Sequence, residues 1–419
     1  MKVSQNWLKE LVDINSTPEV LAEKLSIGGF EVESLKDTSL QVKGVLLGNV
    51  LSVEKHPNST KLSVCQVDIG NKNILQIVCG ARNIKSDIHV YVATVGSYLS
   101  SIGLSIKKSE IRGVSSEGMI CSLEELGLDS NSDGIEIIDP STIKDHKLGT
   151  EASKILGLND HIFDLAITAN RPDGMSVIGI AREISALLQT KLTLPPEHEI
   201  INLNAFKENK LCQETINKEC IYTISFIDNV NGKQTSPKWI KERLEKSDIK
   251  SKNLIVDITN YILLEQGQPL HAFDLEKLSQ LIGREVLPED FGVRKAKNGE
   301  FLTALDGIKY ELNENISIVV CSDKPVAIAG VIGGLETAVT EQTSSIILEG
   351  AVFNPSIIRK SSREVGIRTE SSSRFEKGIS YRNTLNSLSR AFYLLNQYFK
   401  ESKPTIYSSK IINKEKKSI

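Results

Sequence analysis

The sequence predicts an α+β protein built from several domains. Its 419 residues exceed what one hydrophobic core of ordinary size serves, which implies roughly two to four domains. Apolar side chains recur at helical spacing at the beginning of the chain, whereas short β-rich runs dominate between Val42 and Asp139. Helical and β-rich stretches then alternate, which favours mixed domains over an all-helical or all-β fold.

Composition and charge exclude several classes of protein. No stretch approaches the roughly 18 consecutive apolar residues of a membrane span, and the start MKVSQNWLKELVDI has the pattern of an amphipathic helix rather than a signal peptide. A formal net charge of -3 argues against a broadly basic nucleic-acid coat but allows a local basic patch. The six cysteines lack metal-binding or disulfide spacing, so we expect buried free thiols in a cytoplasmic protein.

Two short helices open the chain. Ser4 can cap the first helix, and Thr17 with Pro18 starts the second. Gly28 and Gly29 then end that helix.

A small barrel is predicted next. The runs VLLGNVLSVEKH, KLSVCQVDIG, NILQIVCGA and HVYVATVG are separated by Gly, Asn and Pro turn signals. About five strands in roughly one hundred residues favour an oligonucleotide/oligosaccharide-binding (OB) fold. Basic and acidic side chains are nearly balanced here, so a purely structural barrel is an equal alternative to an RNA-binding one.

A strand, a turn and a helix follow the barrel in the segment DLAITANRPDGMSVIGIAREISALL. Its NRPD motif is strong turn chemistry, and apolar residues then recur at helical spacing. Arg171 could bind a ligand, but we expect it to pair with Asp164 or Asp173. The linker LTLPPEHEI then introduces a third unit, at about residues 202–399.

The segment TNYILLEQGQPLHAFD carries the first candidate site residues. Helical periodicity runs up to Gly267 and Pro269, so QPLHAFD leaves the helix in an extended form. We expect this departure to fold His271 back toward the start of the helix, where Asn260 would face the same pocket.

The next section is β-rich and contains the glycine run AGVIGG. Asn-Gly at 298–299 and Asp-Gly at 306–307 predict hairpins. Gly330, Gly333 and Gly334 permit positive φ or close approach to a ligand. Neither GxxxxGK[ST] nor GxGxxG is present, which disfavours nucleotide binding by this run.

These motifs, in this order, resemble bacterial phenylalanyl-tRNA synthetase β chains. HPNSTKL, QIVCGARN and IRGVSSEGMICSLEELGL are similar to the tRNA-binding barrel of that family. NRPD, TNYILLEQGQPLHAFD, AGVIGG, LEGAVF and GIRTESSSRFEKGIS extend the resemblance over nearly all 419 residues. The departures at residues 59–60 and 379–380 are mild and lie outside the proposed pocket.

The resemblance implies a domain order. Residues 1–39 and 151–195 would form an N-terminal α/β domain, interrupted by a tRNA-binding OB-fold barrel at 40–150. Residues 200–399 would be a mixed α/β editing domain of the B3/B4 type, and 400–419 would begin a truncated B5-type domain. The chain would then correspond to the N-terminal half of the family's β chain.

The resemblance also implies an editing site. His271 and Asn260 would position the water or the ester, and the substrate would contact Thr259, Ala272, Gly330 and Glu349. Glu349 is the candidate that recognises a tyrosine hydroxyl. Arg368, Glu370, Arg374, Glu376 and Lys377 form an alternating-charge stretch, which we interpret as an ion-paired structural segment. No metal ligands are predicted, and weaker candidates for tRNA contacts are Lys55, Lys61, Arg82, Lys107 and Arg112.

The implied function is that of a phenylalanine–tRNA ligase β chain. With an α chain in an α2β2 heterotetramer, it would support ATP-dependent charging of tRNA(Phe) and would hydrolyse mischarged Tyr-tRNA(Phe). This segment would bind no cofactor, since ATP is used at the α chain and the family's Mg2+ ligands lie beyond residue 419. No membrane or DNA partner is expected. The alternative is a non-enzymatic tRNA-binding or scaffolding module with an inactive pocket.

Overall fold

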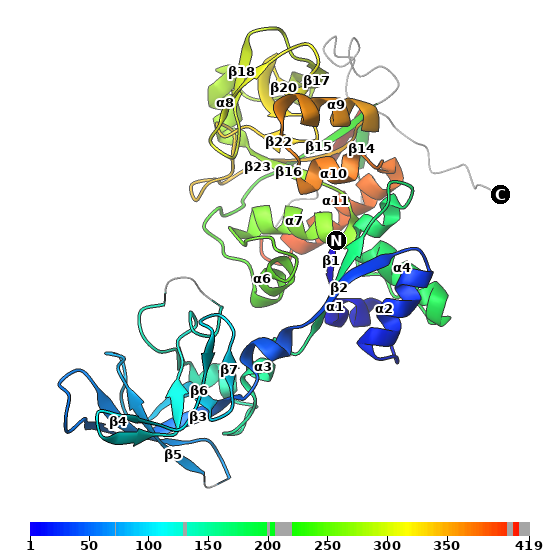
Figure 1. Ribbon diagram of the computed structural model, residues 1–419. Coiled ribbons are helices and arrows are strands. Elements are labelled where there is room, and N and C mark those ends of the chain that lie inside the picture. The colour runs from blue at the N-terminus through cyan, green and yellow to red at the C-terminus, as the bar shows by residue number, and fades with distance from the viewer. Residues whose placement is uncertain (72, 129–131, 199–201, 206–219, 400–404, 410–419) are drawn as a thin grey trace. The chain divides into compact units, whose positions relative to one another are not determined.

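The computed structural model describes residues 1–71, 73–128, 132–198, 202–205, 220–399 and 405–409, and its backbone forms two compact units (Figure 1). One unit comprises Met1–Leu35 together with Phe163–Ile419, and the other comprises Lys36–Ile162. The second unit is therefore inserted into the first along the chain. The finer division into four domains stays a prediction.

The inserted unit is built around an antiparallel sheet with the order β11-β6-β3-β4-β5, to which β12 adds along β6. The two ends of this order, β11 and β5, contact each other, so the sheet is nearly closed. The structure thus confirms the predicted OB-type barrel. The strands are β3 (Val45–Lys55), β4 (Ser63–Asp68), β5 (Ile74–Cys79), β6 (Ile88–Thr94), β11 (Gly118–Ile120) and β12 (Ile137–Ile138).

Short elements complete this unit. They are the hairpins β7 (Tyr98–Leu99) with β8 (Leu104–Ser105) and β9 (Ser109–Ile111) with β10 (Val114–Ser116), the 3-10 turns η1 (Thr38–Val42) and η2 (Pro140–Ile143), and α3 (Ala152–Ile155). Arg112 and Gly113 both have positive φ at the β9–β10 turn, the backbone that a two-residue hairpin requires. His56 is a buried turn residue whose ring bonds backbone groups of Asn58 and Ile111.

The first unit opens with the predicted helices and a small sheet. Ser4 caps α1 by accepting from the Trp7 N–H, and Thr17 caps α2 from the position before Pro18. Strands β1, β13 and β2 form a sheet with β13 in the middle. The elements are β1 (Lys2–Ser4), α1 (Gln5–Leu11), α2 (Pro18–Ile27), β2 (Glu31–Asp37), β13 (His161–Ala166), η3 (Pro172–Met175) and α4 (Val177–Leu188).

A five-stranded sheet with the order β14-β24-β15-β23-β16 forms the centre of the rest of this unit. Its strands are β14 (Asn202–Ala205), β15 (Ile221–Ile227), β16 (Leu270–Asp274), β23 (Ile346–Val352) and β24 (Thr405–Ser408). Residues 405–408, expected to begin a following domain, instead pair with β15 and β14. The rest of that expected domain start lies outside the described residues.

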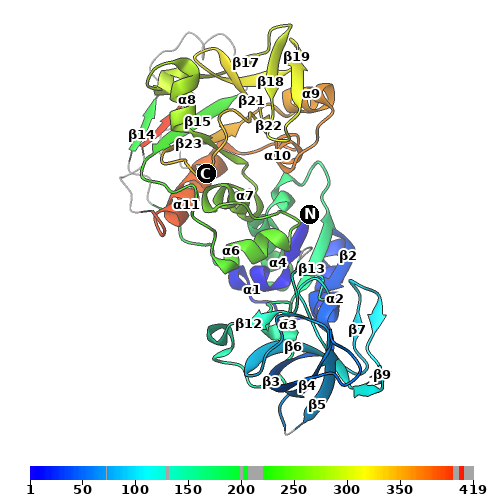
Figure 2. The same ribbon diagram turned by 90° about the vertical axis from the view of Figure 1, so that its left-hand side faces the viewer.

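Two different layers cover the two faces of this sheet (Figures 1 and 2). Helices α7 and α11 pack on one face, in a core that contains Ala272 and Leu348. A second sheet, β17-β20-β21-β22, lies beyond the other face, in a core that contains Phe273 and Ile347. Because neighbouring residues of a strand point to opposite faces, this arrangement fixes what each residue of β16 and β23 can touch.

The remaining elements surround these layers. They are α6 (Lys238–Glu245), α7 (Leu254–Gln266), α8 (Leu275–Ile282), η4 (Pro288–Asp290), β17 (Phe291–Lys295), β18 (Glu300–Thr303), β19 (Lys309–Leu312), β20 (Ser317–Cys321), β21 (Lys324–Ile328), β22 (Ile332–Gly333), α9 (Pro355–Val365), α10 (Glu370–Phe375) and α11 (Tyr381–Leu395). The turn at 306–307 joins the paired strands β18 and β19, as predicted. The turn at 298–299 is not a hairpin, because β17 pairs with β20 and β18 pairs with β19.

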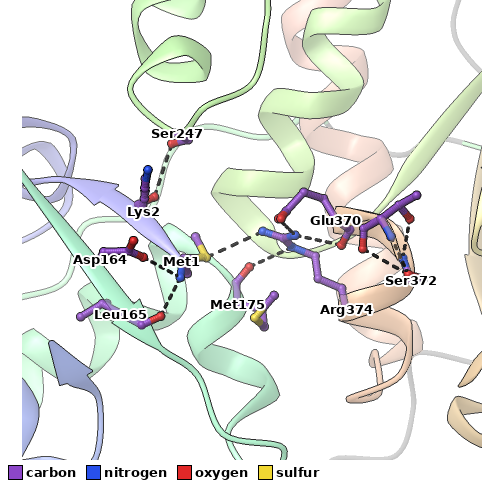
Figure 3. Close-up of polar contacts among 10 residues, drawn as sticks. Met1, Lys2, Asp164, Leu165, Met175, Ser247, Glu370, Ser372 and Arg374 are labelled. Atoms are coloured by element: carbon purple, nitrogen blue, oxygen red, sulfur yellow. Dashed lines mark hydrogen bonds and ion pairs between the residues drawn. The ribbon is translucent and has the colours of Figure 1, made fainter. Parts of the chain in front are cut away.

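Arg374 ties α10 to the N-terminal part of its unit (Figure 3). Its guanidinium is buried and donates to the Met175 carbonyl at 3.0 Å and to the Glu370 carboxylate at 2.6 Å. The Met1 amino group pairs with Asp164 at 3.3 Å beside it. The structure confirms the ion-paired interpretation for Arg374 and Glu370.

Other sequence predictions have mixed outcomes. Arg171 pairs with Asp173 at 2.9 Å and also with Glu183 at 2.8 Å, but not with Asp164. Among the described cysteines all five are free thiols, and four of them are buried, whereas Cys220 is partly exposed. Cys212 lies outside the described residues. Within the described part of the chain, no helix is long and apolar enough to cross a membrane.

Candidate functional site

The candidate site lies where β16 pairs with β23. Helix α7 ends at Gly267, whose φ of 76° is the left-handed conformation that glycine adopts readily. The chain then reverses through Gln268 and Pro269 into the edge strand β16, as the sequence predicts. In the antiparallel register His271 stands directly opposite Glu349, so both side chains point to the same face of the sheet.

A small cavity lies at this pair. Its volume is about 60 Å³, enough for one or a few water molecules. Five segments of the chain contribute its lining, which is Pro269, Leu270, His271, Val319, Ala327, Ile328, Gly330, Val331, Ile332, Gly333, Glu349, Ser371 and Phe375. Most of these residues have apolar side chains, and only His271 and Glu349 among them are titratable.

The His271 imidazole lies in a poorly solvated place. Its Nε2 atom is enclosed and has no hydrogen-bond partner among the described residues. The ring packs edge-on against Phe273, with centroids 4.4 Å apart. Burial lowers the pKa of His271 to about 4, because the charged imidazolium is disfavoured away from water. At neutral pH the imidazole is therefore uncharged, and its free nitrogen can bond a water molecule.

The Glu349 carboxyl group is also buried, with 8% of the residue exposed. Burial raises its pKa to about 7, although the hydrogen bond from Tyr222 acts in the opposite direction. The Tyr222 hydroxyl donates to Glu349 Oε2 at 2.9 Å. Burial, and next the nearby Glu349 charge, raise the pKa of Tyr222 well above its ordinary value, so the phenol stays a donor.

Two glycines of the AGVIGG run have different roles. Gly330 has a φ of 66°, and a Cβ there would meet the core side chains of Ile358, Phe353 and Phe375 at 2.9–3.0 Å. Gly333 has no left-handed φ, but a Cβ there would lie 2.4 Å from His271 Cε1 and 2.7 Å from its Nε2. The His271 ring thus packs directly against the backbone of Gly333, where a Cβ would not fit.

Three predicted site residues do not line this cavity. Thr259 is buried within α7, where its hydroxyl donates to the Val256 carbonyl at 2.7 Å. Asn260 follows it on the same helix, which packs on the face of the sheet opposite to His271. Ala272 points to that opposite face as well, because it is the neighbour of His271 in the strand. The expectation that Asn260 and His271 face one pocket stays a prediction, since Asn260 is not among the residues that line this cavity.

Tyr222 is a site residue that sequence reasoning missed. It lies on β15, in the diagonal position next to Ile224, the residue opposite Glu349. The only sequence signal is the apolar, β-rich run IYTISFI, which predicts a buried strand but no partner for the phenol. The partner depends on the pairing of strands more than one hundred residues apart.

The five basic candidates of the barrel, which are Lys55, Lys61, Arg82, Lys107 and Arg112, are all exposed. Lys107 lines a cavity of about 800 Å³ on this unit, together with apolar side chains and with Glu124 and Glu125. The mixed charge of this lining agrees with the balanced composition of the segment. Among the described residues, no group of three or more His, Cys, Asp or Glu side chains is arranged to hold a metal ion.

Two protein-family models match the chain. Residues 219–400 match the B3/4 domain, which contains the whole cavity around His271 and Glu349. Residues 45–147 match a putative tRNA binding domain, which corresponds to the barrel.

Curated relatives match along nearly the whole sequence. A beta subunit of phenylalanine–tRNA ligase from Prochlorococcus marinus subsp. pastoris is 68% identical over 98% of this chain and 50% of its own length. The subunit of the same name from P. marinus strain MIT 9312 is 67% identical over 99% of this chain and 51% of its own. The beta subunit from P. marinus strain SARG is 52% identical over 95% of this chain and 48% of its own length. The chain thus spans about half the length of these relatives.

Proposed function

This chain belongs to the family of phenylalanine–tRNA ligase beta subunits, and we propose that it hydrolyses mischarged Tyr-tRNA(Phe) at His271 and Glu349, with the attacking water in the small cavity that both residues line. In the same proposal it supports the attachment of phenylalanine to tRNA(Phe), together with an alpha subunit that carries out the synthesis. The observation that carries the editing proposal is the buried Glu349 carboxyl group, which faces His271 across paired strands.

A second, hydrolytic site has a physical reason. A synthetic pocket shaped for phenylalanine is apolar, and it rejects an analogue that merely adds a hydroxyl by only about a hundredfold. Tyrosine therefore reaches tRNA(Phe) at a rate that requires later correction. A site with the opposite chemistry, in which a buried polar group needs the hydroxyl, can select the mischarged product.

Glu349 supplies that chemistry. Its carboxyl group lies among mostly apolar side chains and can bond a phenol hydroxyl, whereas a phenylalanine ring leaves the group unpaired. An unpaired buried polar group costs roughly 1–3 kcal/mol, and more when it is charged. This difference corresponds to about one or two orders of magnitude in relative affinity.

His271 is the candidate for positioning the attacking water. Its uncharged imidazole offers Nε2 as an acceptor to a water molecule in the cavity. The water oxygen attacks the ester carbonyl carbon and the bond to the ribose oxygen breaks. One proton of the water goes to the ribose oxygen, and the other is released from the new carboxylic acid to solvent. An activated ester needs an aligned water more than a strong nucleophile, which is consistent with the single histidine among the described residues that line this cavity.

Other parts of the proposal reach beyond this cavity. We keep Thr259, Asn260, Ala272 and Gly330 as predicted contacts of the editing substrate. We assign the exposed basic side chains of the barrel to weak contacts with tRNA. In the assembled ligase, an α2β2 heterotetramer of the cytoplasm, ATP and Mg2+ would serve the synthetic reaction rather than the cavity described above.

Deacylation assays test the proposal. Tyr-tRNA(Phe) and Phe-tRNA(Phe) are each incubated with this chain and with the assembled ligase that contains it. We expect preferential hydrolysis of Tyr-tRNA(Phe). His271→Ala should lower the rate at least tenfold, and Glu349→Ala should abolish the preference for tyrosine.

Glu314→Ala, a change at an exposed position outside the cavity, is the control and should behave as the unchanged protein. If the assembled ligase hydrolyses Tyr-tRNA(Phe) and the double change His271→Ala/Glu349→Ala leaves the rate untouched, editing takes place elsewhere. If the assembled ligase does not hydrolyse Tyr-tRNA(Phe) at all, the result favours the alternative of a non-enzymatic tRNA-binding module.

A further inference from the structure

Tyr222 and Glu349 form a buried hydrogen-bonded pair, of which Glu349 lines the cavity beside His271. Both residues are buried, and the phenol hydroxyl donates to the carboxyl group at 2.9 Å, a normal length for an O–H···O bond. The bond joins β15 to β23 from side chains 127 positions apart in the chain. It therefore exists only because the central sheet is assembled in this register.

The surroundings hold Tyr222 in place. Its ring stacks on Phe291, with centroids 6.3 Å apart, and no part of the residue is exposed. A buried ring packed between strands has little rotational freedom, so its hydroxyl is fixed relative to the sheet. Glu349, by contrast, has a long side chain that would otherwise sample several rotamers.

The bond distinguishes the two carboxyl oxygens of Glu349. Oε2 accepts from Tyr222, and Oε1 has no hydrogen bond to the described residues. An ionised carboxylate can accept more than one hydrogen bond. The second oxygen is thus the one left for an incoming hydroxyl, in a residue that also lines the cavity beside His271.

We propose that Tyr222 is a positioning residue for tyrosine selection, which holds Glu349 by one oxygen and leaves the other to accept the substrate hydroxyl. This inference rests on the proposed editing function and deepens it. Tyr222 acts through Glu349 and need not touch the substrate.

The hydrogen bond from Tyr222 also influences the charge of the Glu349 carboxyl group. The hydrogen bond from Tyr222 favours the ionised form of Glu349 and so keeps its pKa lower than burial alone would. The other titratable groups that face the pair are His271 on β16, Cys321 on β20 and Cys220 just before β15. His271 is uncharged near neutral pH, so Tyr222 is the group that supports the carboxylate.

Tyr222→Phe tests the inference, because it removes one oxygen atom and retains the packed ring. In the assembled ligase, we measure kcat/KM for deacylation of Tyr-tRNA(Phe) and Phe-tRNA(Phe) between pH 6 and 9. The ratio of the two should rise with pH as Glu349 ionises, because a charged acceptor binds a hydroxyl more strongly. Tyr222→Phe should lower the ratio at neutral pH about five- to tenfold and move its midpoint to higher pH.

Tyr261→Phe is the matched control. Tyr261 is also fully buried and donates to a buried carboxylate, Glu265, at 2.7 Å, but it lies on α7 in the core on the opposite face of the sheet. This change should affect stability and leave both the ratio and its midpoint unchanged. A carbon-13 NMR titration of the Glu349 carboxyl group, assigned with Glu349→Gln, gives a second readout that does not depend on turnover.

The outcomes separate the two proposals. A lower ratio together with a higher pKa of Glu349 in Tyr222→Phe supports the positioning role. An enzyme that edits, but whose ratio and Glu349 pKa are unaffected by Tyr222→Phe, overturns the positioning role and leaves the editing function intact. An unchanged enzyme with no preference for Tyr-tRNA(Phe) overturns both.

Discussion

The substitution Gly333→Ala should disable the candidate site without replacing any titratable residue. A Cβ at this position would lie 2.4 Å from His271 Cε1 and 2.7 Å from Nε2, where ordinary contacts are 3.4 Å or more. To restore such a contact, the imidazole must move by about 1 Å. The backbone of Gly333 is not left-handed, so the methyl group causes a steric effect and no conformational strain.

A shift of that size has a large expected effect on rate. Misplacement of a catalytic group by about 1 Å can cost about a hundredfold. We therefore expect kcat for deacylation of Tyr-tRNA(Phe) to fall between ten- and a hundredfold, measured with the assembled ligase under saturating substrate. Gly80→Ala is the control, because a Cβ there has its nearest neighbour at 3.4 Å and the site lies in the barrel.

A double-mutant cycle identifies the cause. If Gly333→Ala acts only through the imidazole, the double change Gly333→Ala/His271→Ala should be no slower than His271→Ala alone. Wild-type turnover by Gly333→Ala would refute the placement of His271 at the reacting centre. Strictly additive losses would show that the methyl group damages the site in another way.

The pH dependence of stability, a buried arginine and the surface of the barrel give three further predictions. Between about pH 4 and 6.5 the unfolded state binds more protons than the folded state at His271, so this group makes stability rise with pH; Glu349, with its raised pKa, has the opposite effect between about pH 4.5 and 7. Glu349→Gln removes the opposing effect of Glu349. The free energy of unfolding of this variant, measured by urea titration, should therefore rise by up to about 3 kcal/mol between about pH 4 and 6.5, and a flat profile would contradict the lowered pKa of His271. Arg374→Met should lower the free energy of unfolding in urea by about 2–4 kcal/mol, because it leaves the Met175 carbonyl unpaired. Its control, Lys238→Met, breaks only an exposed ion pair of 3.6 Å with Glu242 and should change stability little. Lys107→Ala/Arg112→Ala should make the plot of log binding constant for tRNA against log salt concentration less steep, by at most about two released ions. An unchanged slope would support a purely structural barrel.

Local features of the structure could be predicted because they depend on neighbours in sequence. The caps at Ser4 and Thr17, the end of α7 at Gly267 and the extended course of residues 270–274 all follow from residue type and spacing. The barrel was predictable for the same reason, since alternating runs and turn residues mark each strand. Placement of Glu349 and Gly330 as site candidates came from the resemblance to a family, not from periodicity.

The differences between the sequence predictions and the structure have one physical origin. Consecutive residues of a strand point to opposite faces of the sheet. The position of a residue in a motif therefore does not reveal which layer its side chain packs against. His271 and Ala272 are adjacent in the motif, yet they lie in different layers, and Asn260 belongs to the helix that covers the Ala272 side. Similarly, the turn at 298–299 has hairpin chemistry but joins strands that pair with other partners.

The sequence by itself determined the helix ends and the barrel strands and indicated the family of this protein, because each depends on local chemistry or on a string of motifs. Only the tertiary structure decided that Glu349 stands opposite His271, that Gly333 makes room for the imidazole, and that Tyr222 bonds the carboxyl group. These contacts arise from the register of distant strands, which minimises the exposure of apolar faces over the whole unit and is not encoded at any single position.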